Sequence, residues 1–150
     1  MLSRTAEYLY WISRYMERAE TTARLLDVGY RMSLFPNPSG YNNEWESVLS
    51  AAGAIEGYKN KYDIIEQKNV EDYLFFDESN PSSVYNCILN ARNNALVVRT
   101  SFTPESWLAI NKTYQEILSL KEKKFSKSDL PDLTAVSYTH LRAHETVSDR

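Results

Sequence analysis

The sequence predicts an all-α protein, a helical bundle of about five helices, and three observations lead to this prediction. Apolar residues recur at alternating steps of three and four over residues 1–34 and over two later stretches. Turn residues separate these stretches. The composition, 43% hydrophobic and 25% charged, is ordinary for a globular chain. No apolar run approaches the roughly 20 residues of a membrane span.

Residues 1–34 are expected to form one long amphipathic helix. Ser3 is its expected N-cap, and Pro36 and Pro38 end the pattern. The steps place one face against other helices: Leu9, Ile12, Met16, Ala19, Ala23, Leu26 and Tyr30. Two favourable i,i+4 ion pairs are expected on the same helix: Glu20 with Arg24, and Asp27 with Arg31.

A second stripe on this helix consists of Glu7, Arg14, Arg18 and Leu25, so three of its four residues are charged. Trp11 and Glu17 lie beside it. Apolar residues on two sides predict that the helix is covered on two sides. Arg14 and Arg18 are then expected to be partly buried, with Glu7 and Glu17 as local partners. The favoured interpretation is a structural ion network. The alternatives are an anion-binding site built on arginine geometry and a solvated face.

The next elements are a loop over residues 35–42 and a second helix. Asn43 is the expected cap of that helix, which runs to about Glu56 and stops at Gly57. Its inward face is predicted to contain Trp45, Val48, Leu49, Ala52 and Ile55. Residues 58–68 are expected to continue this helix or to form a short one.

Three further elements are expected before residue 122. Asn69 is a candidate cap for a short helix, although a strand over residues 73–76 is an alternative. Asn80 as N-cap and Pro81 at the first helical position predict a helix to residue 102. Its buried face is expected to contain Val84, Ile88, Ala91, Ala95, Val98 and Phe102. Thr103 opens the last helix, whose face is Trp107, Ile110, Tyr114, Ile117 and Leu118.

The end of the chain has a different character. Residues 136–146, VSYTHLRAHET, resemble the in-frame translation of a transposase-type sequencing adapter. Residues 1–134 are therefore expected to be the protein domain, and residues 135–150 a non-native tail. The two histidines, His140 and His144, both fall in that tail. Without them, imidazole-based catalysis is not expected, and the sequence predicts no catalytic residue, metal site or cofactor.

Charge and cysteine content limit the possible environments and partners. The formal net charge of −3 shows no basic excess of the kind that indicates nucleic-acid binding. The first residues lack the apolar core of a signal peptide. Cys87, the single cysteine, agrees with a reducing cytoplasm and lies in an apolar helical pattern. A buried structural thiol is therefore expected, and the predicted location is cytoplasmic, without membrane attachment.

Two blocks of sequence resemble the bacterial Alpha-E family. The first, from Leu2 to Asp27, is similar to the family pattern LSRTA…LYW…RY.ERAE.TARLLD, and the Glu-Arg signature falls on Glu17 and Arg18. The second matches at Asn80-Pro81-Ser82-Ser83, Ala91-Arg92, Asn94-Ala95, Val98-Arg99, Glu105, Trp107 and Ile110-Asn111. Departures from the pattern occur at Asn93, Leu96 and Thr100. The family domain is longer, so the resemblance implies its N-terminal half.

The resemblance implies an all-helical domain linked by gene context to peptide synthesis or modification. The implied partners are circularly permuted ATP-grasp and transglutaminase-like proteins. If the two blocks pack together, one cationic cleft for a carboxylate or phosphate is expected, formed by Glu7, Arg14, Glu17, Arg18, Arg92 and Arg99. The favoured function is a non-catalytic helical component of such a system. The alternatives are an enzyme that handles an activated carboxyl group and a purely structural bundle.

Overall fold

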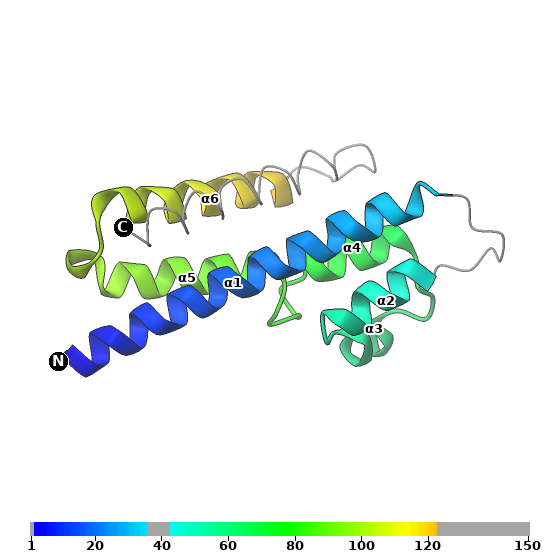
Figure 1. Cartoon of the computed structure of the whole chain (residues 1–150), viewed down its shortest axis with the longest axis horizontal. Helices are drawn as coiled ribbons and strands as arrows, with labels where there is room; N and C mark the ends of the chain where they lie inside the picture. Colours follow the sequence, from blue (N-terminus) through cyan, green and yellow to red (C-terminus); the bar gives the residue numbers. More distant parts are fainter. Residues whose placement is uncertain (1, 36–42, 123–150) are drawn as a thin grey trace.

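A computed structural model of the chain describes residues 2–35 and 43–122. Within these residues it contains six α-helices, one short 3-10 helix and no strand (Figure 1). The all-α prediction is confirmed, with one helix more than expected. Most of the predicted loop over residues 35–42 and the adapter-like tail lie outside the described residues. The elements are α1 (Leu2–Ser33), α2 (Asn43–Ala51), α3 (Ile55–Lys61), α4 (Gln67–Phe75), α5 (Val84–Val97), η1 (Arg99–Ser101) and α6 (Pro104–Glu122).

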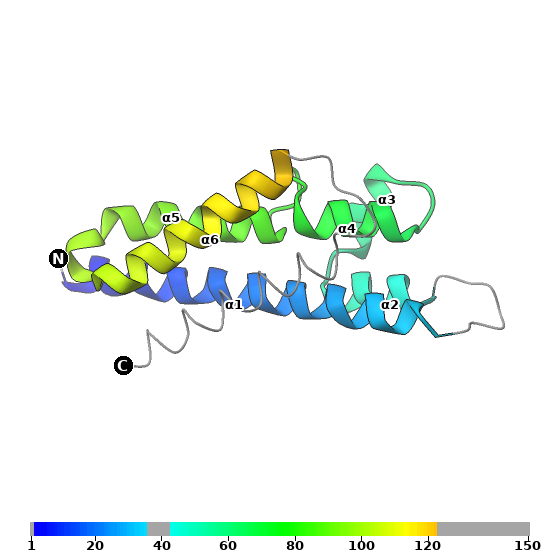
Figure 2. The ribbon, with the colours of Figure 1, turned by 90° about the horizontal axis from the view of Figure 1, so that it is seen from above.

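Helix α1 is the long axis around which the other helices are arranged. Helix α5 lies along its N-terminal half, with α6 packed on α5, and α2 and α4 lie along its C-terminal half (Figure 1, Figure 2). The predicted apolar face is confirmed, because its central residues are buried: Ile12, Met16, Ala19, Ala23 and Leu26. The prediction for Ser3 is wrong: α1 already begins at Leu2, so Ser3 lies inside the first turn and cannot be the N-cap.

The turn after α2 brings the end of that helix to the side of α1. Helix α2 stops at Ala51, and Gly53 has a positive φ of 68°. The N–H of Ala54 donates to the carbonyl of Leu49 at 2.9 Å, and the N–H of Gly53 donates to Ser50 at 3.0 Å. These two bonds define a glycine-dependent helix end. The predicted stop at Gly57 is therefore wrong, and this residue lies inside α3.

Helix α4 starts at Gln67, two residues before the predicted cap at Asn69. The alternative strand over residues 73–76 is wrong, because residues 73–75 are helical. Tyr73, Leu74 and Phe75 are all buried. A run of consecutive apolar residues is compatible with either a buried strand or a buried helix. Only the packing of the neighbouring helices around α4 decides between these two structures.

The turn before α5 uses its polar residues differently from the prediction. Ser83 is the N-cap of α5, and its hydroxyl accepts a hydrogen bond from the N–H of Asn86 at 3.2 Å. The side chain of Asn80 instead closes a local turn by accepting from the N–H of Ser82 at 3.1 Å. Its amide donates to the carbonyl of Tyr73 at 3.0 Å. Asn80 therefore fixes the turn to α4, and the position of Ser82 follows from this turn.

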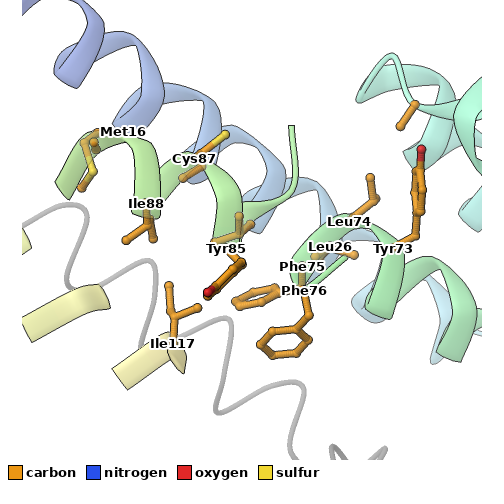
Figure 3. Packing of buried hydrophobic residues seen from close by; sticks show 14 of the residues in the cluster. Met16, Leu26, Tyr73, Leu74, Phe75, Phe76, Tyr85, Cys87, Ile88 and Ile117 are labelled. Carbon is orange, nitrogen blue, oxygen red and sulfur yellow. The ribbon is translucent and has the colours of Figure 1, made fainter. Parts of the chain in front are cut away.

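Helices α5 and α6 complete the core. Helix α5 ends at Val97, earlier than predicted, and η1 follows before Thr103. The predicted start of α6 is confirmed: the Thr103 hydroxyl accepts from the N–H of Ser106 at 3.1 Å. Figure 3 shows Tyr85 of α5 between Ile117 of α6 and the phenylalanine pair Phe75 and Phe76. The core is thus shared by all six α-helices, with Trp45 and Leu49 from α2 and Tyr58 from α3.

Candidate functional site

A surface pocket of about 280 Å³ lies at the middle of α1, where α2 ends and α5 begins. We name it the arginine pocket. Three segments line it: Arg14, Glu17, Arg18, Thr21, Thr22 and Leu25 from α1, Ala51 and Ala52 at the end of α2, and Ser82 before α5. Part of the charged stripe predicted from the sequence therefore lies in a concave site.

Local structure explains why these segments meet. At about 100° per residue, the lining positions between Arg14 and Leu25 share one side of α1. The turn at Gly53 places Ala52 beside this side of the helix. The turn closed by Asn80 presents Ser82 from the opposite edge. The pocket therefore depends on one regular helix and two hydrogen-bonded turns.

The charged groups of the arginine pocket are exposed. Arg14 Nη1 lies 3.2 Å from Glu17 Oε2, and the two side chains are 52% and 59% exposed. Arg18 is also exposed, and within residues 2–35 and 43–122 it forms no ion pair. The expected partial burial of Arg14 and Arg18 is wrong, because no described helix covers this side of α1. An exposed pair contributes only about 0–1 kcal/mol, so a stabilising ion network does not explain these residues.

Cys87 lies in the first turn of α5 and is fully buried. Burial raises the pKa of its thiol to about 11, and the positive charge of Arg18 acts in the opposite direction. The thiol is therefore protonated near neutral pH, whereas the thiolate is the nucleophilic form. The predicted structural role of Cys87 is supported by this burial.

A second pocket, of about 300 Å³, lies nearer the N-terminus of α1. We name it the aromatic pocket. Its lining residues are Arg4, Glu7, Tyr8, Trp11 and Tyr15 from α1 and Asn94 from α5. Trp11 and Tyr15 are in ring contact, with centroids 5.9 Å apart. Glu7 therefore lies in a different pocket from Glu17.

Arg92 and Arg99 do not join the α1 arginines. Arg92 points toward α6, where its Nε donates to Asn111 Oδ1 at 3.0 Å. Its guanidinium lies 4.8 Å from the ring centroid of Tyr114 and 5.9 Å from that of Trp107. Arg99 is exposed in η1, beyond the end of α5, so the seven-residue spacing does not place it on one helical stripe with Arg92. The six candidate residues therefore do not form one cleft.

The arginine pocket offers hydrogen-bond donors to an anion. Two guanidinium groups and the hydroxyls of Thr21, Thr22 and Ser82 line it. In the part of the chain that the structure describes, no three His, Cys, Asp or Glu side chains gather in the manner of a metal site. Across the same residues, no helix combines the length and apolar character needed to cross a membrane.

A family model described as a predicted alpha-helical domain with a conserved ER motif, Alpha-E, matches residues 1–145. The chain belongs to the Alpha-E family. The match extends to residue 145 and so includes most of the adapter-like segment. Comparisons with curated proteins and with solved structures gave no match.

The Glu-Arg motif of this Alpha-E domain has one possible position. Glu17-Arg18 is the only Glu-Arg dipeptide in the sequence. Both residues line the arginine pocket, and both are exposed. The residues that give the Alpha-E family its signature therefore coincide with a concave polar surface of this chain.

Sequence reasoning missed several residues of this site. Thr21 and Thr22 follow Arg18 by three and four positions, so their helical spacing alone indicated a shared face. Ala51, Ala52 and Ser82 had no such signal. They reach the pocket through turns whose geometry depends on Gly53 and Asn80.

Proposed function

We propose that this Alpha-E domain is a non-catalytic component of a bacterial peptide synthesis or modification system and binds a carboxylate or phosphate at the arginine pocket. The single observation that supports the proposed anion site most directly is the position of Arg18. Its guanidinium is exposed in the pocket and has no ion-pair partner among the described residues. An arginine fork matches the paired oxygens of a carboxylate or phosphate.

The surroundings of Arg18 support an anion as the ligand. Thr21, Thr22 and Ser82 add hydroxyl groups that donate hydrogen bonds without adding negative charge. Ser82 directly precedes Ser83, the N-cap of α5, and the positive end of a helix dipole favours an anion. Glu17 is the only carboxylate among the lining residues, and Arg14 pairs with it.

The biological context is proposed from the family resemblance described above. Circularly permuted ATP-grasp and transglutaminase-like proteins are the proposed partners. Cysteine chemistry does not favour the enzymatic alternative, because the buried Cys87 thiol is protonated near neutral pH. Co-expression with an ATP-grasp protein of the same genome, followed by affinity capture, tests this part of the proposal. Failure to capture that protein contradicts the proposed partnership.

Calorimetric titration with inorganic phosphate and with N-acetylglycine tests the binding site. We expect both anions to bind weakly, and Arg18→Gln to weaken binding about tenfold or more, since a charged hydrogen bond contributes roughly 1.5–3 kcal/mol. Arg31→Gln is the matched control, because Arg31 is an exposed arginine of α1 that pairs with Asp27 outside the pocket. Absence of binding, or equal binding by both variants, contradicts the proposal.

A further inference from the structure

The arginine pocket and the aromatic pocket lie next to each other on the same side of α1. The first is lined from Arg14 onward, and the second contains Tyr15. The guanidinium of Arg18 lies 6.0 Å from the centroid of the Tyr15 ring. A residue of the aromatic pocket therefore contacts a residue of the arginine pocket, so the two pockets adjoin.

The segment that runs from Ser82 into α5 borders both pockets. Ser82, just before α5, lines the arginine pocket, and Asn94, near the end of α5, lines the aromatic pocket. Because α1 and α5 run in opposite directions, the start of α5 faces the middle of α1 and its end faces the start of α1 (Figure 1). The two pockets thus follow one another along α1, the arginine pocket near its middle and the aromatic pocket near its start, and we call the pair the groove.

The groups at the aromatic end favour a ring as their ligand. Tyr8, Trp11 and Tyr15 contribute three aromatic rings, and Trp11 is 40% exposed. Arg4 and Glu7 add one charge of each sign, so this end has no net charge to select an ion. Aromatic side chains prefer offset or edge contacts with other rings.

The spacing of the two ends indicates the length of the ligand. Trp11 and Arg18 are seven residues apart, which is about 10 Å along a helix. An extended peptide advances about 3.3 Å per residue, so about three residue steps cover this distance. A carboxylate at Arg18 thus places the third residue before the C-terminal residue beside Trp11.

We propose that the groove binds the free C-terminus of a short extended peptide, with an aromatic side chain three residues before its last residue held by Trp11. This inference rests on the proposed anion site and adds a specificity subsite to it. The side-chain amide of Asn94 at the aromatic end and the hydroxyl of Thr21 at the arginine end offer hydrogen bonds to the peptide.

Calorimetry with four peptides that carry a free C-terminus or an amide tests the subsite on the full chain. Phe-Gly-Gly-Gly is expected to bind about tenfold more tightly than tetraglycine. Gly-Gly-Gly-Phe, with the ring at the wrong position, is expected to bind like tetraglycine. Amidation of Phe-Gly-Gly-Gly is expected to weaken binding about tenfold, because it removes the negative charge of the peptide carboxylate that pairs with Arg18.

Variants of the chain identify the residue that binds the phenylalanine ring of the peptide. Trp11→Ala is expected to remove the gain from phenylalanine, so that Phe-Gly-Gly-Gly and tetraglycine bind this variant with equal affinity. Trp11→Phe keeps a ring and is expected to retain most of the gain. Phe35→Ala is the control, because Phe35 is an exposed aromatic residue of the described chain outside both pockets.

The outcomes separate the two proposals. If tetraglycine binds in an Arg18-dependent manner but phenylalanine adds no affinity, or its gain survives Trp11→Ala, the aromatic subsite is wrong and the anion site stands. If tetraglycine does not bind, or binds equally well to Arg18→Gln, both proposals are wrong.

Discussion

The guanidinium of Arg18 lies over the ring of Tyr15, 6.0 Å from its centroid, and this contact links the two pockets of α1. Arg18 is exposed, and Tyr15 packs against the edge of the core. The arginine of the Glu-Arg motif is therefore held from below by a ring and presented to solvent. The proposed binding role of Arg18 therefore does not depend on a role in folding.

We expect Arg18→Ala to leave the free energy of unfolding within about 1 kcal/mol of the unaltered chain, since exposed charges contribute little. Chemical denaturation with urea measures this change. A loss of about 3–5 kcal/mol, typical of a broken buried pair, would show instead that Arg18 belongs to a structural network.

Gly29→Ala is expected to destabilise the protein by about 1–3 kcal/mol through overpacking. A Cβ at this position would lie 2.8 Å from Val48 Cγ2 and 2.9 Å from Trp45 Cζ3, and both side chains are buried. Val28→Ala, at the exposed neighbouring position, is the control and is expected to change stability little. Equal stability of the two variants in thermal melts argues against the close contact of α1 and α2.

Two neighbouring serines are expected to have different roles. Ser83→Ala removes the N-cap of α5 and is expected to cost about 0.5–2 kcal/mol of stability. Ser82→Ala is expected to leave stability nearly unchanged and to weaken phosphate binding, because Ser82 lines the arginine pocket. Denaturation and phosphate titration of both variants check this division. The reverse result would show that the turn before α5 is misassigned.

Cys87 is expected to make stability depend on pH in alkaline solution. Burial raises the pKa of its thiol from the ordinary 9.0 to about 11. Between these values the unfolded chain loses the proton first, so this contribution is complete below pH 9 and is lost as the pH rises through 11. The loss is at most about 2–3 kcal/mol.

Urea denaturation from pH 8 to 11 measures this loss in the unaltered chain and in Cys87→Ala. Burial also raises the pKa of Tyr58, Tyr62, Tyr73 and Tyr85, so both proteins lose stability and only their difference reports the thiol. Parallel curves for the two proteins would contradict the raised pKa of Cys87.

Removal of residues 135–150 is expected to leave the thermal midpoint unchanged, because their sequence resembles a translated adapter. The comparison is between the full chain and a chain that ends at Thr134. A midpoint lowered by several degrees would show that this segment contributes to the domain.

The sequence by itself predicted the helical class and the buried face of each long helix. The alternating steps from Ile12 to Leu26 identified the face that packs on other helices, and Thr103 identified the start of α6. These predictions succeed because periodicity and a simple cap depend on residues close together in the chain.

Tertiary structure decided where several helices end and which polar residues meet. Gly53 and not Gly57 ends α2, and Ser83 and not Asn80 caps α5, because neighbouring hydrogen bonds compete for each turn. The side chain of Arg92 donates a hydrogen bond to Asn111 on α6, whereas Arg18 is exposed in the same pocket as Ser82. A helical repeat records the side on which an arginine lies, but the partner depends on the segment that packs against that side.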